Sequence, residues 1–497
     1  MNLITAMPAR RFELLYPCVA LISLVLSAAA VLTDQVINRD GITYLAAADA
    51  FRADGVAAVM PHYDWPLFPM LIGLVGEALG ISSGAAAHLL QAAFAAATCV
   101  MFTALVARLF DDRLITVLGA FVILFLPEFN DLRSDIIREQ GYAACVLTAL
   151  YALLRYLDGR TLRWLAAVAV SVAAATLFRL EGLALAALLP LLALIGSDRP
   201  LSHRVREALA LYAAVGLALA LGIGILLASD AVQQFGPGKL QQVARFVDSL
   251  TGPFWEGLTD RARKTQTEIF PNPYDDFGLL AMLGGAAAIA LYRLAANLGV
   301  VVLVLLAYGY RNADRRQRRL VLAIGAMSLI APVLFLLDRG FVTSRYLLPA
   351  SLGLLLLAPA GAAALIDQLW ERAAVGRRRA LAGVLALMAV ALVADSVAEF
   401  HTDKHYLKEA GQWLAAHSRP GDAILTNNSV VAYYSQRIDE PRETPPCIDS
   451  VDWEEVRYLA LVVDTADGDT LPPAARVVAE FRNRNGKKVL ILQGPPS

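Results

Sequence analysis

The sequence predicts an all-α polytopic membrane protein with a small α/β domain at its carboxyl end. Of its 497 residues, 58% are hydrophobic and only 18% are charged, and the mean hydropathy is +0.55. A soluble protein of this length needs far more charge to cover its surface. The apolar residues also recur in blocks of about 20, the helix length that crosses about 30 Å of hydrocarbon. The net charge of −1 gives no indication of a nucleic-acid partner.

The first apolar run, at about 14–33, follows Arg10 and Arg11 and is predicted to be a retained signal-anchor helix. The next apolar block, 66–79, is short and contains two prolines, so it either spans the membrane or lies in the interface. If it does not span, the later arginine-rich loops all fall on the side of Arg10, which the positive-inside rule makes cytoplasmic. If it spanned, that rule would fail in five loops. We therefore predict that 66–79 is a re-entrant or interfacial helix.

This parity predicts eleven spans in the inner (plasma) membrane, with the amino terminus in the cytoplasm and the carboxyl terminus periplasmic or extracellular. A charge at mid-membrane is costly, and Arg293 and Asn297 would lie inside a span that began at 278. We therefore place 278–292 in the outer interface. The predicted helices are at about 14–33, 84–107, 114–127, 140–157, 164–178, 182–196, 208–229, 294–310, 320–337, 347–366 and 380–396.

Two domains are expected: a transmembrane domain at 1–396 and an extracytoplasmic α/β domain at 397–497. The main outer loops of the first domain are 34–83, with two short helices, and 230–281. Helical spacing at 404–417 and strand-like runs at 423–426, 456–463 and 488–492 define the second domain. The four cysteines form neither a disulfide framework nor a CxxC zinc pattern. No cofactor is predicted with certainty, and a divalent metal stays open.

Asp40 directly follows the first span and is a candidate for the working carboxylate. It is equally suited to be the N-cap of a helix beginning at Gly41, and the two roles are compatible. Glu139 and Asp135 stand where a later helix begins, and acids there suit the positive helix end. Charged residues nevertheless crowd this short loop at the membrane boundary, where charge is expensive unless it is used.

Other polar candidates lie at the outer ends of later helices. Arg179 and Glu181 flank a tight turn, where they pair with each other or with headgroups, or serve a substrate. Arg345 and Tyr346 are either interface anchors or phosphate ligands, because a guanidinium fork matches phosphate oxygens. Two further residues are also counted as candidates for substrate or donor-phosphate binding: Tyr44 and Arg293.

Several motifs occur in a fixed order over about residues 10–360. Asp40 with Tyr44 is followed by the Pro-rich aromatic segment 65–69 and by an Ala-Arg-Leu-Phe turn at 107–110. An acidic second outer loop then leads into a helix. The set is completed by an Arg-x-Glu-Gly turn (179–182) and an Arg-Tyr-x-x-Pro helix entry (345–349). This ordered set resembles the GT-C superfamily of membrane glycosyltransferases, closest to the branch of protein O-mannosyltransferases and the lipid A aminoarabinose transferase.

The resemblance implies sugar transfer from a polyprenyl-phosphate-linked donor to a hydroxyl of a lipid, glycan or protein acceptor at the outer face of the bilayer. It implies that Asp40 is the catalytic base or orients the acceptor. Glu139, with Asp135 as second choice, would assist, and Arg345 would contact the donor phosphate. The sequence departs from the family pattern in having a single acid at Asp40 and no DxD in the second loop, which puts metal dependence in doubt.

Two other functions are consistent with a polytopic chain. A transporter or flippase for a lipid-linked sugar would commonly show inverted repeats and paired broken helices, and no matching halves are evident. A non-catalytic scaffold would use the carboxyl-terminal domain to bind a partner. The charges cluster at the outer boundary and not at mid-membrane, which argues against a transporter, and the crowded acids in two separate outer loops argue mildly against a scaffold.

Overall fold

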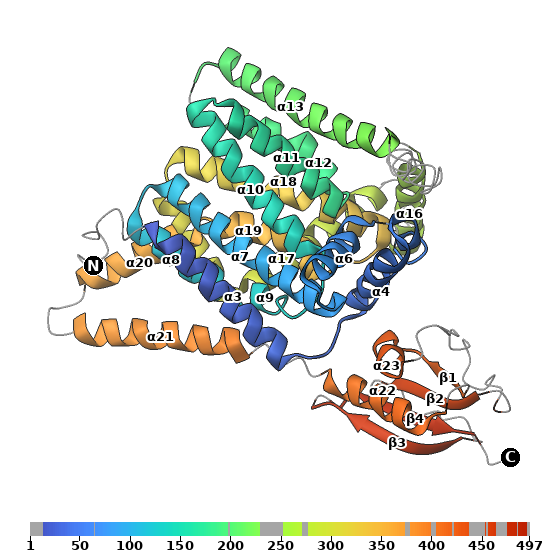
Figure 1. The fold of residues 1–497 in the computed structure, drawn as a ribbon. Coiled ribbons are helices and arrows are strands. Elements are labelled where there is room, and N and C mark those ends of the chain that lie inside the picture. Colours follow the sequence, from blue (N-terminus) through green and yellow to red (C-terminus); the bar gives the residue numbers. More distant parts are fainter. Residues whose placement is uncertain are drawn as a thin grey trace.

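The computed structural model consists of a helical bundle and a small α/β domain, joined at one end of the bundle (Figure 1). The predicted fold class is confirmed. The structure describes residues 13–63, 65–196, 199–228, 252–270, 277–372, 378–398, 404–419, 422–436, 453, 456–463, 475–484 and 486–494.

Helices account for all of the described secondary structure before the carboxyl-terminal domain. In chain order they are α3 (Leu15–Thr33), α4 (Arg39–Asp54), α5 (Val56–Val59), α6 (Leu67–Leu79), α7 (Ser83–Phe110), α8 (Arg113–Leu124), α9 (Pro127–Asn130), α10 (Glu139–Gly159), α11 (Leu162–Phe178), α12 (Gly182–Leu188), the 3-10 turn η1 (Leu189–Leu194), α13 (Leu201–Ala228), α16 (Pro253–Ile269), α17 (Gly278–Asn312), α18 (Arg315–Arg339), the 3-10 turn η2 (Ser344–Leu347), α19 (Leu348–Leu355), α20 (Ala358–Arg372) and α21 (Arg378–Ala398).

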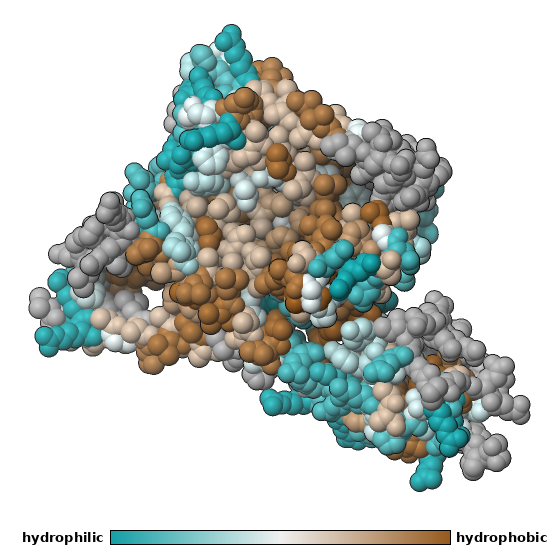
Figure 2. Space-filling view, viewed as in Figure 1, coloured by the Kyte–Doolittle hydropathy of each residue, from teal (hydrophilic) through white to brown (hydrophobic). Residues whose placement is uncertain are grey.

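Helix α10 forms the centre of the bundle and packs against α7, α11 and α19. Its leucines Leu147, Leu150 and Leu153 are fully buried. Outward-facing residues of the bundle are apolar as well, and they form a broad brown surface in Figure 2, whereas the carboxyl-terminal domain is largely teal. Apolar side chains on both the inner and the outer faces of helices are expected when lipid replaces water around them.

Every predicted membrane helix falls mostly on helical residues of the structure, but the number of crossings stays a prediction. Six described helices are long and apolar enough to span, or seven if the pair 344–355 and 358–372, bent by 46°, forms one span. Four further apolar helices are shorter: Leu67–Leu79, Arg113–Leu124, Leu162–Phe178 and Gly182–Leu194.

Two predicted boundaries were wrong. The helical break falls at Gly299 (φ 71°) and not near residue 293, because α17 (Gly278–Asn312) consists of two helical segments that meet at a kink there, and the placement of 278–292 in the interface stays a prediction. Glycine tolerates this conformation without the steric cost that a side chain would add. The predicted helix 347–366 is instead broken into η2, α19 and α20.

Four of the five arginine-rich loops that were predicted to share one side of the membrane lie together at one end of the bundle, and residues 373–377 of the fifth lie outside the described residues. Arg108 forms an ion pair with Asp158, and Gln317 donates to the carbonyl of Leu109 (2.7 Å). Arg316 joins the same cluster by donating to the carbonyl of Gly196 (2.7 Å). The predicted alternation of loops is therefore consistent with the packing, and the assignment of this end to the cytoplasm stays a prediction.

The carboxyl-terminal domain contains α22 (His405–His417), α23 (Ser429–Tyr434) and a four-stranded sheet in the order β1-β2-β4-β3. Strand β1 (Ala423–Thr426) is parallel to β2 (Val456–Val463), and β4 (Lys488–Gln493) runs antiparallel to both β2 and β3 (Arg476–Arg482). Three strands and α22 match the prediction, whereas β3 and α23 were missed.

Candidate functional site

Asp40 lies in the first turn of α4, and it does not cap that helix. The N-cap position is held by Asn38, so the capping role considered for Asp40 was wrong. The Asp40 carboxylate instead accepts a hydrogen bond from the guanidinium of Arg345, which is 305 residues away in the chain. Two candidate site residues that are far apart in the sequence, Asp40 and Arg345, are therefore in contact in the fold.

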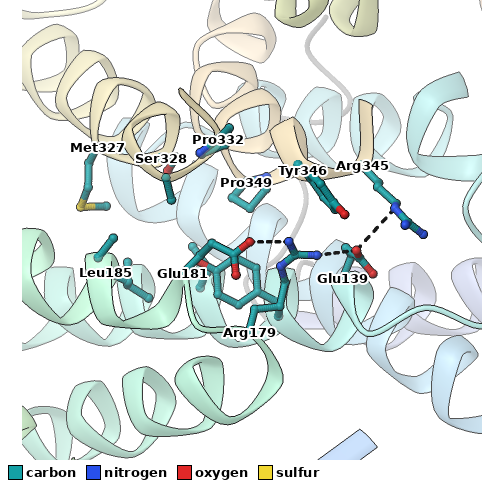
Figure 3. Close-up of a pocket in the computed structure, with 14 residues that line it drawn as sticks. Glu139, Arg179, Glu181, Leu185, Met327, Ser328, Pro332, Arg345, Tyr346 and Pro349 are labelled. Atoms are coloured by element: carbon teal, nitrogen blue, oxygen red, sulfur yellow. Dashed lines mark hydrogen bonds and ion pairs between the residues drawn. The ribbon is translucent and has the colours of Figure 1, made fainter. Parts of the chain in front are cut away.

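A row of alternating charges continues inward from this pair. Arg345 Nε lies 3.6 Å from Glu139 Oε1, and the same oxygen accepts a hydrogen bond from Arg179, which also binds Glu181 (Figure 3). Four separate parts of the chain thus converge: the start of α4, the start of α10, the turn before α12, and η2. Glu139 is also in the first turn of α10, where the helix dipole favours a carboxylate.

Burial divides the row into an inner and an outer part. The Glu139 and Arg179 side chains are each 5% exposed, whereas Arg345 is 27% and Asp40 35% exposed. A buried charge pair without further partners would be unfavourable, and here Arg179 gains two carboxylates. The inner pair therefore forms the fixed base of the site, and Asp40 is the carboxylate that faces a solvent-accessible space.

Arg179 and Glu181 remain charged in this environment. Burial alone lowers the pKa of Arg179, but the carboxylates of Glu181 and Glu139 outweigh it and raise the pKa above its ordinary value. Burial likewise raises the pKa of Glu181, but Arg179 more than offsets this, and the net pKa is lowered. The ring of Tyr346 covers both guanidinium groups, with its centroid 4.5 Å from Arg179 Cζ and 5.5 Å from Arg345 Cζ.

Two adjacent cavities share Glu139, Arg345 and Tyr346. The first, of about 400 Å³, is called the polar cavity; it is lined by Asp40, Thr43, Tyr44, Tyr63, Arg138, Glu139, Arg345 and Tyr346. The second, of about 510 Å³, extends between α10, α12, α18 and α19 and is called the apolar-walled cavity (Figure 3); its lining is Glu139, Tyr142, Val146, Arg179, Glu181, Ala184, Leu185, Met327, Ser328, Ala331, Pro332, Arg345, Tyr346 and Pro349.

Aromatic rings form one wall of the polar cavity. The ring of Tyr44 makes edge contacts with Tyr63 (centroids 4.9 Å apart) and with Phe68 (5.2 Å). Burial and the neighbouring Tyr63 raise the pKa of Tyr44, so its phenol stays neutral and able to donate a hydrogen bond. The predicted substrate-binding residue Tyr44 therefore lines the cavity that contains Asp40.

Two predicted residues lie elsewhere. Arg293 is exposed on α17 and lines neither cavity. Asp135 also lines neither cavity. Burial raises the pKa of Asp135, and Lys404 of the carboxyl-terminal domain opposes that rise. The charges of Arg345 and Asp40 also act on Asp135, so it lies near the site without lining either cavity, and Glu139 is the acid of this loop that lines both cavities.

Arg138 belongs to the site and was not predicted. It lines the polar cavity with its guanidinium 5.8 Å from the centroid of the Tyr63 ring, and within the described residues no carboxylate pairs with it. Arg345 and Arg179, by contrast, are already bound to carboxylates. No sequence pattern distinguishes Arg138 from its neighbours, because its importance depends on which other charges are neutralised in the fold.

The nearby Arg133 has a structural role. It is 1% exposed and inserts between α3 and α7. There it donates to Ser23 Oγ (3.0 Å) and Ser27 Oγ (2.9 Å) on α3 and to Asn130 Oδ1 (2.6 Å). The charges that crowd the second outer loop in sequence therefore separate in space, because Arg133 holds the loop in the bundle while Arg138 and Glu139 face the cavities.

No group of three or more His, Cys, Asp or Glu side chains suited to hold a metal ion occurs within the described parts of the chain. Asp275 and Asp276, two adjacent acids in the sequence that form a weak candidate pair for a metal, lie outside the described residues. Metal dependence stays untested.

Comparison with known proteins identifies the architecture. Residues 61–226, about a third of the chain, match the dolichyl-phosphate-mannose-protein mannosyltransferase family. No curated protein sequence has significant similarity to the chain.

Solved structures cover most of its length. The archaeal oligosaccharyltransferase AglB from Archaeoglobus fulgidus, in complex with an inhibitory peptide and a dolichol-phosphate, superposes with a TM-score of 0.52 at 12% identity, over 90% of this chain and 69% of its own. ArnT from Cupriavidus metallidurans bound to undecaprenyl phosphate superposes with a TM-score of 0.51 at 15% identity, over 97% of this chain and 98% of its own. At these identities the similarity establishes the fold.

Proposed function

From the GT-C fold that this chain has in common with those structures, we propose that it is a membrane glycosyltransferase. It moves a sugar from a polyprenyl-phosphate-linked donor to an acceptor hydroxyl on the periplasmic face, with inversion at the anomeric carbon. The single observation that carries the proposal is the position of Asp40. This half-exposed carboxylate lies in a polar cavity that adjoins an apolar-walled cavity through Arg345 and Glu139.

The two cavities suit two substrates of different character. The apolar-walled cavity lies between helices of the bundle and offers leucine, methionine, alanine and proline side chains next to Arg179 and Arg345. This combination fits a phosphate attached to a hydrocarbon chain. The polar cavity, with its tyrosines, carboxylates and Arg138, fits the hydroxyl-rich acceptor. The titles of the AglB and ArnT structures name bound dolichol-phosphate and undecaprenyl phosphate, and the matched family is named for a dolichyl-phosphate donor, which supports a lipid-phosphate donor here.

The reaction requires a base on one side of the sugar and positive charge on the other. In the proposed step the acceptor oxygen attacks the anomeric carbon while the bond from that carbon to the phosphate oxygen breaks, and Asp40 takes the acceptor proton. Attack opposite to the leaving group inverts the configuration, as in glycosidases that displace directly. The electron pair of the broken bond remains on the phosphate, which gains one negative charge that guanidinium groups stabilise.

Arg345 is placed to serve both halves of this reaction. It binds Asp40 and Glu139 in the structure, and it lines both cavities. A donor phosphate at Arg345 competes with Asp40 for the guanidinium. Donor binding would therefore free the Asp40 carboxylate to accept the acceptor proton, so that the base becomes available only when a sugar is present. Arg138 supplies a further cation in the polar cavity, and among the described residues it forms no ion pair with a carboxylate.

Glu139 is proposed to orient a substrate. Its Oε1 receives both guanidinium contacts, whereas Oε2 is buried and has no hydrogen-bond partner in the described structure. A buried carboxylate oxygen without a partner is expensive. A substrate hydroxyl that donates to Oε2 would satisfy it, and the fixed pair with Arg179 would hold the direction of that bond.

The experiment uses the purified full-length protein with a panel of polyprenyl-phosphate sugars and candidate acceptors. The readout is release of polyprenyl phosphate. A glycosyltransferase releases it in proportion to glycosylated acceptor. If the protein instead moved an intact lipid-linked sugar across proteoliposome membranes and released no polyprenyl phosphate with any donor, the transporter alternative would replace the proposal.

A further inference from the structure

We propose that the carboxyl-terminal domain positions Asp40, and that Tyr434 is the residue through which it acts. The proposal rests on the proposed function, because it concerns the same carboxylate. In Figure 1 the linker between α3 and α4, which leads directly to Asp40, passes between the bundle and the carboxyl-terminal domain. Contacts between α23 and α4 agree with this view.

Tyr434, at the end of α23, binds the backbone of that linker twice. Its phenol oxygen accepts a hydrogen bond from Ile37 N (3.0 Å) and donates to the carbonyl of Gln35 (2.9 Å). The linker belongs to no helix or strand, so its backbone groups need partners from elsewhere. A single phenol supplies two of them, three and five residues before Asp40.

Apolar contacts fix the same segment on both sides of Asp40. Val36, four residues before it, and Ile42, two residues after it, are buried in one cluster with Leu407, Leu414 and Val431 of the carboxyl-terminal domain. The domain therefore packs against the chain before and after Asp40, while the Asp40 carboxylate itself is bound by Arg345 of the bundle.

The opposite side of the linker rests on the second outer loop, which leads to Glu139. The Asn38 side chain donates to the carbonyl of Ile136 (3.2 Å) and accepts from Ile136 N (2.9 Å). Asp34 accepts from Ser134 Oγ (3.2 Å). The linker is thus held between the carboxyl-terminal domain and the loop that carries the second acid. A shift of the domain would move Asp40 relative to Glu139 and Arg345.

A domain that merely recruits a partner would not need these contacts. Tyr434→Phe in the full-length protein separates the two roles, since it removes one hydroxyl and leaves the ring in place. The matched control is Tyr433→Phe on the same helix, because Tyr433 has no hydrogen bond to the linker among the described residues.

Two readouts are expected to change in Tyr434→Phe and not in Tyr433→Phe. Amide exchange of the peptide spanning 34–42, followed by mass spectrometry, becomes about five- to tenfold faster, as expected when a hydrogen bond of ordinary strength is lost. The kcat for polyprenyl-phosphate release falls roughly 10- to 100-fold, the cost of displacing a catalytic group by a fraction of an ångström to about 1 Å. The KM for the lipid donor stays unchanged, since Tyr434 lines neither cavity.

Unchanged exchange at 34–42, or faster exchange with unchanged kcat, would overturn the proposal. A rise in donor KM with kcat intact would also overturn it, because a general loosening of the site would then explain the effect. A wild-type protein that releases no polyprenyl phosphate would contradict the proposed function, and the exchange rates would still test the contact by themselves.

Discussion

We expect Glu139→Gln to be the less stable variant and Asp40→Asn to be the less active one, although both acids contact Arg345. Glu139 is 5% exposed and pairs with Arg179, which is equally buried, whereas Asp40 is 35% exposed. Each substitution keeps the shape of the side chain and removes its charge. Breaking a buried charge pair costs about 3–5 kcal/mol. Because Arg179 keeps Glu181 as a partner, we expect Glu139→Gln to cost about 3 kcal/mol, the lower end of that range.

Asp40→Asn should cost less than about 1 kcal/mol, the value typical of a pair that solvent reaches. The assay is thermal unfolding of each purified variant in detergent, paired with turnover under saturating donor. Glu139→Gln is expected to unfold at the lower temperature and to retain the greater share of activity. If Asp40→Asn were the less stable variant, the division of the site into a fixed inner pair and an accessible outer carboxylate would be refuted.

Three further predictions follow from the same structure. Arg345→Ala should weaken use of the lipid donor more than it lowers the melting temperature. Arg138→Gln should weaken substrate use less than Arg345→Ala does. Unchanged kinetics for Arg345→Ala would instead indicate that Arg345 is only an interface anchor. Asp135→Asn should raise the melting temperature at pH 8 and leave it nearly unchanged at pH 4, because the raised pKa of Asp135 means that folding is penalised as pH rises through it; an equal effect at both values would contradict this. A phosphatase fused after Ser497 should be active in cells, and an inactive fusion would reverse the assigned orientation.

Much of the fold was accessible from the sequence because lipid imposes simple rules on it. Long apolar runs had to be helices, and the arginine-rich loops indicated which helix ends share a side. The loops carrying Arg108, Gln317 and Arg316 indeed meet at one end. Strand β3 was missed because its side chains are mostly exposed or half-buried and lack the apolar run of its neighbour β4. The break at Gly299 was missed because several other glycines lie in apolar helices without breaking them.

The site was partly predictable for a different reason. Four site residues stand at helix ends on the predicted outer side: Asp40, Glu139, Arg179 and Arg345. Because successive spans alternate in direction, these helix ends lie on the same side of the membrane. Their pairing was not predictable, since it depends on which side chains converge across hundreds of residues. Asn38 was overlooked for the same reason: its partner is the backbone of Ile136, 98 residues away.

The central claim is that Asp40 accepts the proton of the acceptor. The most direct test is the turnover of Asp40→Asn, measured as polyprenyl-phosphate release beside donor binding and melting temperature. Asparagine is nearly isosteric with aspartate, but its amide cannot accept a proton at neutral pH. We predict a loss of about 10²- to 10⁴-fold in turnover, with donor binding and folding retained. Near-normal turnover by Asp40→Asn would contradict the account and leave the cavity without its base.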